Sequence, residues 1–410
     1  MTPEERRAFG AHVAELRERR NLTQKELAAE IGRTASWLSQ VERGVQPVNR
    51  LDVLRLLADG LGVSLQELRP DAPMESTAMP HSQGEESNDL DQARLVISGH
   101  PVPEVLLSRV AGAKTAKPRD LRAAVEHVWE LTHSNQFTEL STALGTLVPR
   151  LERAARTAPQ GERAELWGLL SRTYQALAAA FVQQDEADAA WVAADRALRA
   201  AEESERTLDV FASVFRLTHA FVRLKHFDQA EHAATTAVHA LERQESDDPE
   251  TLSVMGALHL ALALTHARAG ERAKARQETE RARAVAKRLG EDRNDFNLEF
   301  GPTNVEIQAV SIAVDLGDAG EAVEIGLSID ASALSIERRA RLLMDLGRAY
   351  AQRKQFGEAL DTLLNAEALS PDLIHTHTEA RSAIRDLLLV AGRSASPELQ
   401  ALADRADARS

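Results

Sequence analysis

The sequence contains no cysteine, which excludes disulfide bonds, thiolate metal sites and cysteine nucleophiles. Aromatic residues make up only 4% of its 410 residues. No apolar run reaches the roughly eighteen residues that a membrane-spanning helix needs. The opening stretch MTPEERRAFG is charged and lacks the apolar core of a signal peptide. We therefore expect a cytoplasmic protein with no membrane partner.

Alanine and leucine supply most of the hydrophobic residues, which amount to 43% of the chain, and this composition favours closely packed helices over sheets. The net charge of −14 is unevenly distributed. Residues 1–69 hold eleven basic and ten acidic residues, a net charge of +1, so the rest of the chain carries −15. The acidity therefore does not argue against a polyanionic partner for the N-terminal part.

Five short helical patterns occupy the N-terminal part of the sequence. They cover residues 4–20, 23–32, 34–42, 51–61 and 64–68. Thr23 begins the second pattern, and Glu26 three residues later completes a capping box. Thr34 is the expected N-cap of the third, in which Leu38 and Val41 occupy the inward positions. A helix, a short turn and a second helix inside such a bundle is the helix-turn-helix plan.

The string TQKELAAEIGRTASWLSQVERG (residues 23–44) closely resembles the XRE family of DNA-binding domains, the lambda-repressor/Cro type. The matching positions are the Thr-Gln pair that opens the second helix, the Leu-Ala pair within it, the turn glycine and the Ser-x-Val-Glu-Arg-Gly ending. The resemblance covers about residues 9–69. It implies an all-α protein whose residues 1–69 form a five-helix DNA-binding domain.

In this motif the N-terminal half of the third helix enters the major groove of DNA. Gln40 is the best expected base reader because its amide can bond adenine through two hydrogen bonds. The full expected base-reading set is Ala35, Ser36, Ser39 and Gln40. Expected contacts to the DNA backbone, which set register without reading sequence, are Arg17, Gln24, Arg33, Thr34, Trp37, Arg43, Asn49 and Arg50.

Alternatives remain open for three of these residues. The resemblance gives Gln24 either a phosphate contact or a supporting role, whereas Trp37 could be a core aromatic and Arg43 a solvated surface charge. A nearly neutral domain with few phosphate contacts predicts modest affinity per copy. Two copies on a two-fold-symmetric site would restore affinity, so we expect a homodimer on an inverted-repeat operator in double-stranded DNA.

The rest of the chain is expected to be helical and repetitive. The expected segments are a flexible linker (70–95), a connecting segment (96–118), TPR-like helical repeats (119–373) and a C-terminal helical cap (374–410). The clearest unit, residues 343–371, resembles a tetratricopeptide (TPR) repeat, with a Leu-Gly pair, Tyr350, Ala359 and Pro371 at the family's spacing. The alanines expected at the equivalent of Ala359 are Ala187, Ala230, Ala275 and Ala322.

A TPR-like array curves into a superhelix whose inner face binds extended ligands. Repeat register predicts a ligand groove formed by Trp129, Arg172, Gln175, Phe215, His219, Arg223, Arg268, Asn304, Ser311, Arg341 and Arg348. Arginine suits a carboxylate and asparagine a peptide backbone, although each residue could equally be an ordinary polar residue on a solvated face. Residues 293–308 form either a loop that dips toward the groove or a plain connection between repeats.

The domain order resembles two groups of regulators, the RRNPP-type peptide-pheromone receptors and the actinobacterial XRE–TPR proteins. The resemblance implies a sequence-specific transcriptional regulator, associated with the nucleoid when bound to DNA, whose array senses a peptide or small molecule, as in quorum sensing. The alternative is an interaction protein whose array holds a partner protein, with DNA binding secondary. The sequence has no phosphate-binding loop, nucleophile–base pair or metal-ligand spacing, so we expect no enzyme, cofactor or metal site.

Overall fold

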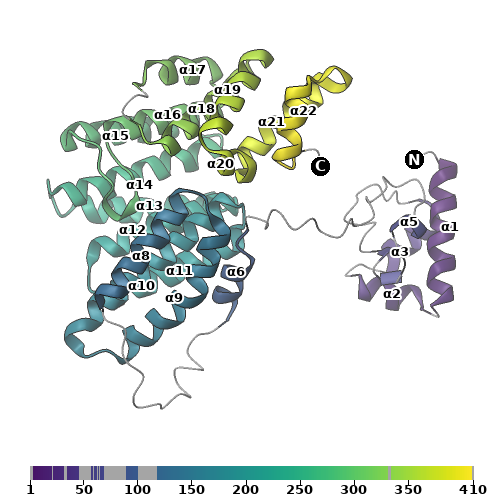
Figure 1. Cartoon of the computed structure of the whole chain (residues 1–410), viewed down its shortest axis with the longest axis horizontal. Coiled ribbons are helices and arrows are strands. Elements are labelled where there is room, and N and C mark those ends of the chain that lie inside the picture. The colour runs from purple at the N-terminus through teal and green to yellow at the C-terminus, as the bar shows by residue number, and fades with distance from the viewer. Residues whose placement is uncertain are drawn as a thin grey trace. The chain divides into compact units, whose positions relative to one another are not determined.

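The computed structural model describes residues 3–20, 22–31, 35–45, 57–58, 60–61, 63, 65–68, 89–99, 118–330 and 334–408. The chain divides into two compact units, Met1–Glu85 and Glu86–Ser410 (Figure 1). Within the described ranges, an antiparallel bridge between Arg293 and Phe300 is the only pairing of extended backbone, and the regular elements are helices. The predicted all-α fold is thereby confirmed. None of the helices described combines the length and hydropathy that a membrane crossing requires.

Among the described residues, the N-terminal unit contains four of the five helices that the sequence predicts. These are α1 (Pro3–Arg19), α2 (Gln24–Glu30), α3 (Ala35–Glu42) and α5 (Leu65–Leu68). Val13, Leu27 and Leu38 are completely buried and form the centre of a small core to which Leu57 and Leu68 also contribute. The predicted helix over 51–61 lies largely outside the described residues.

The capping box at the start of α2 is confirmed. The Thr23 amide donates a 2.8 Å hydrogen bond to Glu26 Oε2, and the Glu26 amide donates to Thr23 Oγ1 at 3.2 Å. Because the carboxylate is the form that accepts the bonds from the Thr23 amide and hydroxyl, these bonds lower the pKa of Glu26. The local sequence therefore sets where the second helix begins.

The predicted linker over 70–95 extends too far, because helix α6 (Asp91–Ser98) begins inside it. Ala93 and Ile97 are buried, and the Ala93 amide donates a 2.7 Å hydrogen bond to Ser141 Oγ. Arg94 forms ion pairs with Glu186 and Asp188. An eight-residue helix has too few apolar positions to show a clear periodicity next to a proline- and serine-rich stretch, so its order depends on packing against the array. Residues 70–88 lie outside the described part.

The C-terminal unit is a stack of antiparallel helix pairs (Figure 1). The pairs are α8 (Pro118–His133) with α9 (Phe137–Thr157), α10 (Gln160–Gln183) with α11 (Ala187–Glu203), α12 (Thr207–Arg223) with α13 (Phe227–Glu242), α14 (Pro249–Arg268) with α15 (Arg272–Leu289), α16 (Pro302–Asp315) with α17 (Ala319–Ser328), and α18 (Ile336–Gln352) with α19 (Phe356–Leu369). The predicted cap is helical, with α20 (Pro371–Thr376), α21 (Thr378–Ala391) and α22 (Pro397–Arg405).

The turn inside each pair has one geometry. A residue with left-handed backbone ends the first helix, and the next amide donates to the carbonyl five residues earlier, which is the longer bond of a Schellman cap. The left-handed residues are Asn135, Asp185, Lys225, Gly270, Gly317 and Lys354. Four of them carry side chains, so the cap geometry outweighs the cost of a left-handed backbone at these positions.

These turns set the register of the repeat. The fourth residue of every second helix is completely buried, and these residues are Leu140, Ala190, Ala230, Ala275, Ala322 and Ala359. The predicted anchor Ala187 is therefore wrong by three positions, since Ala190 takes its place. The cause is that Tyr174 and Phe181 are both buried aromatics two helical turns apart on the long helix α10. Phe181, whose carbonyl accepts the turn bond, is the equivalent of Tyr350.

Candidate functional site

Helix α3 has a buried side and a more accessible side. Leu38 and Val41 are buried in the small core, whereas the side chains of Ala35, Ser39 and Gln40 are half-buried and reach the surface. Ser36 and Trp37 also lie within α3. Three of the four predicted base readers therefore have access to solvent from a helix whose other side is held by packing.

Arg17 does not take the predicted place on the DNA backbone, because it lies in an internal ion pair and is only 9% exposed. Its Nε donates to Glu42 Oε1 at 2.7 Å, its Nη2 to Glu42 Oε2 at 3.1 Å and its Nη1 to the Leu22 carbonyl at 2.8 Å. The Gln24 side chain donates from Nε2 to Oε2 of the same Glu42 carboxylate at 2.6 Å. Of the two roles left open for Gln24, this contact is the supporting one. Glu42 thus joins α1, α2 and α3.

The remaining predicted backbone contacts divide into two groups. Arg43 is exposed immediately after α3, and its Nε donates to the Ser39 carbonyl at 3.2 Å. Arg33, Thr34, Asn49 and Arg50, together with the side chain of Trp37, lie outside the described part of the structure.

Sequence reasoning missed Gly10, which brings α1 against the end of α3. A Cβ atom at Gly10 would lie 2.4 Å from the Val41 carbonyl oxygen and 2.5 Å from that of Glu42. Its only signal in the sequence is a glycine within an otherwise regular helix pattern. Contact between the two backbones positions the candidate recognition helix.

The inner side of the array contains two cavities that share walls. The first, which we name the aromatic cavity, measures about 150 Å³, and Trp129, Phe215, Arg216, Asn304 and Glu337 are among its lining residues. The second, named the arginine cavity, measures about 120 Å³ and is lined by Arg223, Arg268, Ser311, Arg348 and Glu379 among others. The residues common to both are Val182, Gln183, His219, Ile307, Gln308 and Arg341.

The structure brings together all the predicted groove residues except Arg172 and Gln175. Arg172 forms an ion pair with Glu126 at 2.9 Å, and Gln175 is buried between Ser171 and Ser213. Both wrong predictions, for Arg172 and for Gln175, result from the error in the predicted register of α10. Moving two turns along the helix leads to residues 179 and 182, and Ala179 and Val182 do line the aromatic cavity.

The three arginines that line only the arginine cavity are paired with acidic residues. Glu379 Oε1 lies 2.7 Å from both Arg223 Nη1 and Arg268 Nη2. Asp315 lies between Arg268, at 3.0 Å, and Arg348, at 2.7 Å. Burial alone would raise the pKa of Glu379, but His377 and Arg223 outweigh it and lower the pKa well below the usual range. Glu379 thus connects α21 of the cap to α12 and α14.

Residues 293–301 form a loop that reaches the aromatic cavity, which resolves the alternative left open by the sequence. The Arg293 amide donates to the Phe300 carbonyl at 2.8 Å, and the Phe300 amide donates back at 2.9 Å. Phe300 is completely buried, and a Cβ on Gly256 would collide with its ring, so the two residues pack closely. Asn297 and Glu299, at the tip of the loop, line the aromatic cavity.

His219 is a neutral side chain between the two cavities. Burial, followed by the positive charges of Arg216 and Arg268, lowers its pKa to about 3. Its ring lies 4.5 Å from that of Phe215, centroid to centroid. At neutral pH His219 therefore offers a hydrogen-bonding imidazole without adding charge to the groove.

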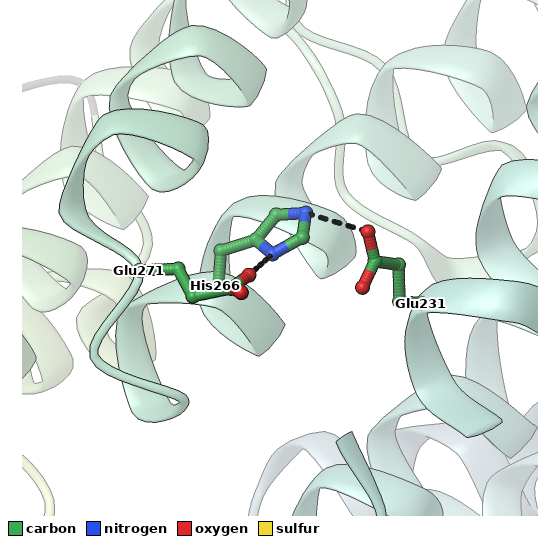
Figure 2. A group of neighbouring side chains, drawn as sticks. All are labelled: Glu231, His266 and Glu271. Carbon is green, nitrogen blue, oxygen red and sulfur yellow. Dashed lines mark hydrogen bonds and ion pairs between the residues drawn. The ribbon is translucent and has the colours of Figure 1, made fainter. Parts of the chain in front are cut away.

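A separate group on the array, Glu231, His266 and Glu271, has donor atoms within 4.8 Å of one another (Figure 2). His266 Nδ1 lies 2.7 Å from Glu271 Oε2, and Nε2 lies 3.9 Å from Glu231 Oε1. Both carboxylates also contact Lys274 Nζ, at 3.1 Å for Glu271 and 3.3 Å for Glu231. The ammonium group occupies the position of a cation between them, so we describe the group as an ion-pair cluster that links α13, α14 and α15.

Residues 8–71 match a family of sequences described as "Helix-turn-helix domain". The N-terminal unit therefore contains a helix-turn-helix domain, as the sequence predicts. No curated protein sequence matches the chain.

Among solved structures, the chain is similar to the crystal structure of Bacillus thuringiensis PlcR in complex with the peptide PapR7 and DNA. The identity is 13%, the match covers 69% of this chain and 96% of that chain, and the TM-score is 0.28.

Proposed function

We propose that this protein is a sequence-specific DNA-binding transcriptional regulator with α3 as its recognition helix. The observation that supports this most is the accessible side of α3, on which Ala35, Ser39 and Gln40 reach the surface within a helix-turn-helix domain. In this proposal Ser36 joins them as a base reader, and Arg43 contacts phosphate from the end of the helix.

The proposed regulator acts as a homodimer on an inverted repeat. Residues 1–69 carry a net charge of only +1, so electrostatic attraction to one half-site is weak. Two linked domains bound to adjacent half-sites, about 34 Å or a multiple of that apart, would supply the missing affinity.

The helical array is proposed to be the sensor, because its inner side holds two adjoining cavities lined by aromatic and charged side chains. Small ligands bind in such concave sites, where apolar walls surround a few polar groups. A ligand there would alter operator binding to the extent that it favours one arrangement of the dimer.

Selection of binding sites from random DNA by the full-length protein tests this function. We expect an enriched inverted repeat; a library with no enriched motif would contradict the proposal. In gel-shift titrations on operator variants, Gln40→Ala should remove about 1–3 kcal/mol of discrimination at one base pair. Arg43→Ala should weaken binding to all sequences alike. Equal losses for both variants would show that Gln40 does not read a base.

A protein partner is the second candidate function, favoured by a wide surface hollow of about 1010 Å³ at α9, α10 and α11. Trp191 and Val192, which line it, are 47% and 40% exposed, and large exposed apolar side chains are frequent at protein interfaces. Purification of the full-length protein from its native cell distinguishes the two: a stoichiometric partner that is lost on Trp191→Ser supports this function.

A further inference from the structure

Among the residues that the structure describes, Arg216 is the cation of the aromatic cavity that has no carboxylate within ion-pair distance. In contrast, Arg338 and Arg341 of the same cavity pair with Glu299 and Glu337. The Nη2 of Arg216 donates to the Asn297 carbonyl at 2.6 Å, but its buried Nε has no hydrogen-bond partner there. A guanidinium has five N–H donors, so Arg216 keeps capacity for an anion.

Two aromatic rings hold the Arg216 side chain in place. Its guanidinium carbon lies 5.2 Å from the ring centre of Trp129 and 5.1 Å from that of Phe215. Trp129 is 3% exposed, and its indole Nε1 is a second buried donor that the described residues leave without a partner. Unpaired buried donors are costly, and here two of them belong to the lining of one cavity.

The charges around the cavity suit an anion. Burial lowers the pKa of Arg216 to about 10, so the group remains charged at neutral pH. Arg338 lies 3.6 Å from Glu299 and Arg341 lies 3.4 Å from Glu337, both loose contacts. Burial raises the pKa of Glu337 to about 7, so this carboxyl is only partly ionised at neutral pH. Three arginines therefore face less than two full negative charges.

The size and the apolar walls of the cavity define the rest of the ligand. Its volume of about 150 Å³ is close to that of an apolar cavity that admits one benzene ring. Ala179, Val182, Leu298 and Ile307 add apolar surface to the two rings. A compact ring or branched aliphatic group fits these walls, whereas a long chain fits only by continuing into the arginine cavity.

We propose that the aromatic cavity binds a carboxylate attached to a compact apolar group, with the carboxylate on Arg216 and the apolar group against Val182, Leu298 and Ile307. This names the ligand class of the sensor and so rests on the proposed function. Two sources share the chemistry: a free small acid, or the C-terminal residue of a peptide. A peptide would run past His219 and Arg341, which line both cavities, into the arginine cavity.

Calorimetric titration of the full-length protein with two matched pairs of probes tests the proposal. The pairs are phenylacetate with phenylacetamide, and acetyl-Ala-Ala-Phe with its C-terminal amide. We expect each acid to bind at least about tenfold more tightly than its amide, because hydrogen bonds to charged groups are the stronger ones. If the tripeptide acid binds more tightly than phenylacetate, the source of the carboxylate is a peptide. If the two acids bind with equal affinity, the source is a free small acid.

The Arg216→Met variant should lose the preference for acids while keeping an unbranched, uncharged stem in place of the arginine. Arg288→Met, on the surface of α15 and paired with Asp247, is the matched control and should bind as the wild type does. Circular dichroism and thermal melting of both variants check folding. If Arg216→Met does not fold, Trp129→Phe, which removes the indole donor and leaves a smaller ring, should weaken acid binding.

Three results would overturn the proposal: acid and amide binding alike, a folded Arg216→Met variant with wild-type preference, or no binding of any probe up to about 10 mM. The titrations contain no DNA. Loss of acid preference with an operator still selected would thus refute the ligand class alone, whereas acid binding without any selected operator would refute the proposed regulator.

Discussion

At the scale of single residues, the environment of a side chain decides its role more than its chemical type does. Arg17 and Arg216 are both arginines on helices, yet Arg17 forms a paired support for α3, whereas Arg216 keeps donors that no described acid takes. The sequence predicts Arg17 as a phosphate contact, because an arginine near a recognition helix has no visible partner until the fold brings Glu42 beside it.

Glu337 should make the stability of the array depend on pH. Burial raises its pKa to about 7, and the charge of Glu299 adds to this, while Arg341 and Arg338 oppose it. The folded state then binds more protons than the unfolded state between about pH 4.5 and 7. Stability should therefore fall as the pH rises through this window, by about 3 kcal/mol for this group.

Urea unfolding at pH 5 and pH 8 measures this effect. Glu337→Gln should lose that part of the pH dependence and exceed the wild type in stability at pH 8. Glu324→Gln, an exposed site on α17, is the control and should follow the wild type. An unchanged slope between pH 5 and pH 8 in Glu337→Gln would show that the carboxyl titrates normally.

At the scale of helices, periodicity predicts most elements of this chain, and turn chemistry predicts their ends. The capping box at Thr23 and the clear repeat at 343–371 both appear in the structure where the sequence places them. The error on α10 arises because Tyr174 and Phe181 satisfy the same pattern two turns apart, and only the turn at Asp185 distinguishes them. Helix α6 is missed because eight residues give a weak pattern.

The Arg17–Glu42 pair should be essential to the arrangement of α1, α2 and α3. Both side chains are largely buried, at 11% and 7% exposure, so Glu42→Ala leaves an uncompensated charge on Arg17 and removes the acceptor of Gln24. We expect the helix-turn-helix domain to lose about 3–5 kcal/mol of unfolding free energy. Chemical denaturation of the full-length protein, with DNA binding as the signal that monitors unfolding, reports on this domain.

The double variant Arg17→Met with Glu42→Leu separates charge from packing. Replacing a buried ion pair by apolar residues of similar volume is often close to neutral. The double variant should therefore recover about half of the loss or more, although the Gln24 amide and the Leu22 carbonyl lose their partners in it. A double variant as unstable as Glu42→Ala would mean that the contacts of Gln24, and not the unpaired charge, account for the loss.

At the scale of the whole array, five of the six arginines that line the two cavities form ion pairs with acidic residues of the array, and Arg216 is the exception among the described residues. Arg223 and Glu379 are 156 residues apart in the chain, and Arg268 and Asp315 belong to different helix pairs. Repeat register could predict which of these residues face the groove, because that depends on spacing. It could not predict their pairing, because a contact between distant repeats depends on the curvature of the stack and leaves no periodic signal.

Glu379 should hold the C-terminal cap to the middle of the array. Glu379→Gln preserves size but removes the charge that Arg223 and Arg268 share at 2.7 Å, while Asp315 remains to pair with Arg268. A local loss of about 3 kcal/mol is expected for breaking a buried pair. Since each 1.4 kcal/mol is tenfold in a population, amides of α21 should exchange hydrogen on the order of 100-fold faster.

Hydrogen exchange read by mass spectrometry tests this prediction, because the effect should be confined to one part of the array. Peptides from α21 and α22 should exchange faster in Glu379→Gln, whereas those from α8 and α9 should not change. Glu280→Gln, an exposed ion-pair member on α15, is the control and should leave both regions unchanged. Faster exchange throughout the array would mean that Glu379 supports the whole stack. If instead no region changed, packing of α21 on α18 would be sufficient to hold the cap, and the arginine cavity would keep its shape without the Glu379 charge.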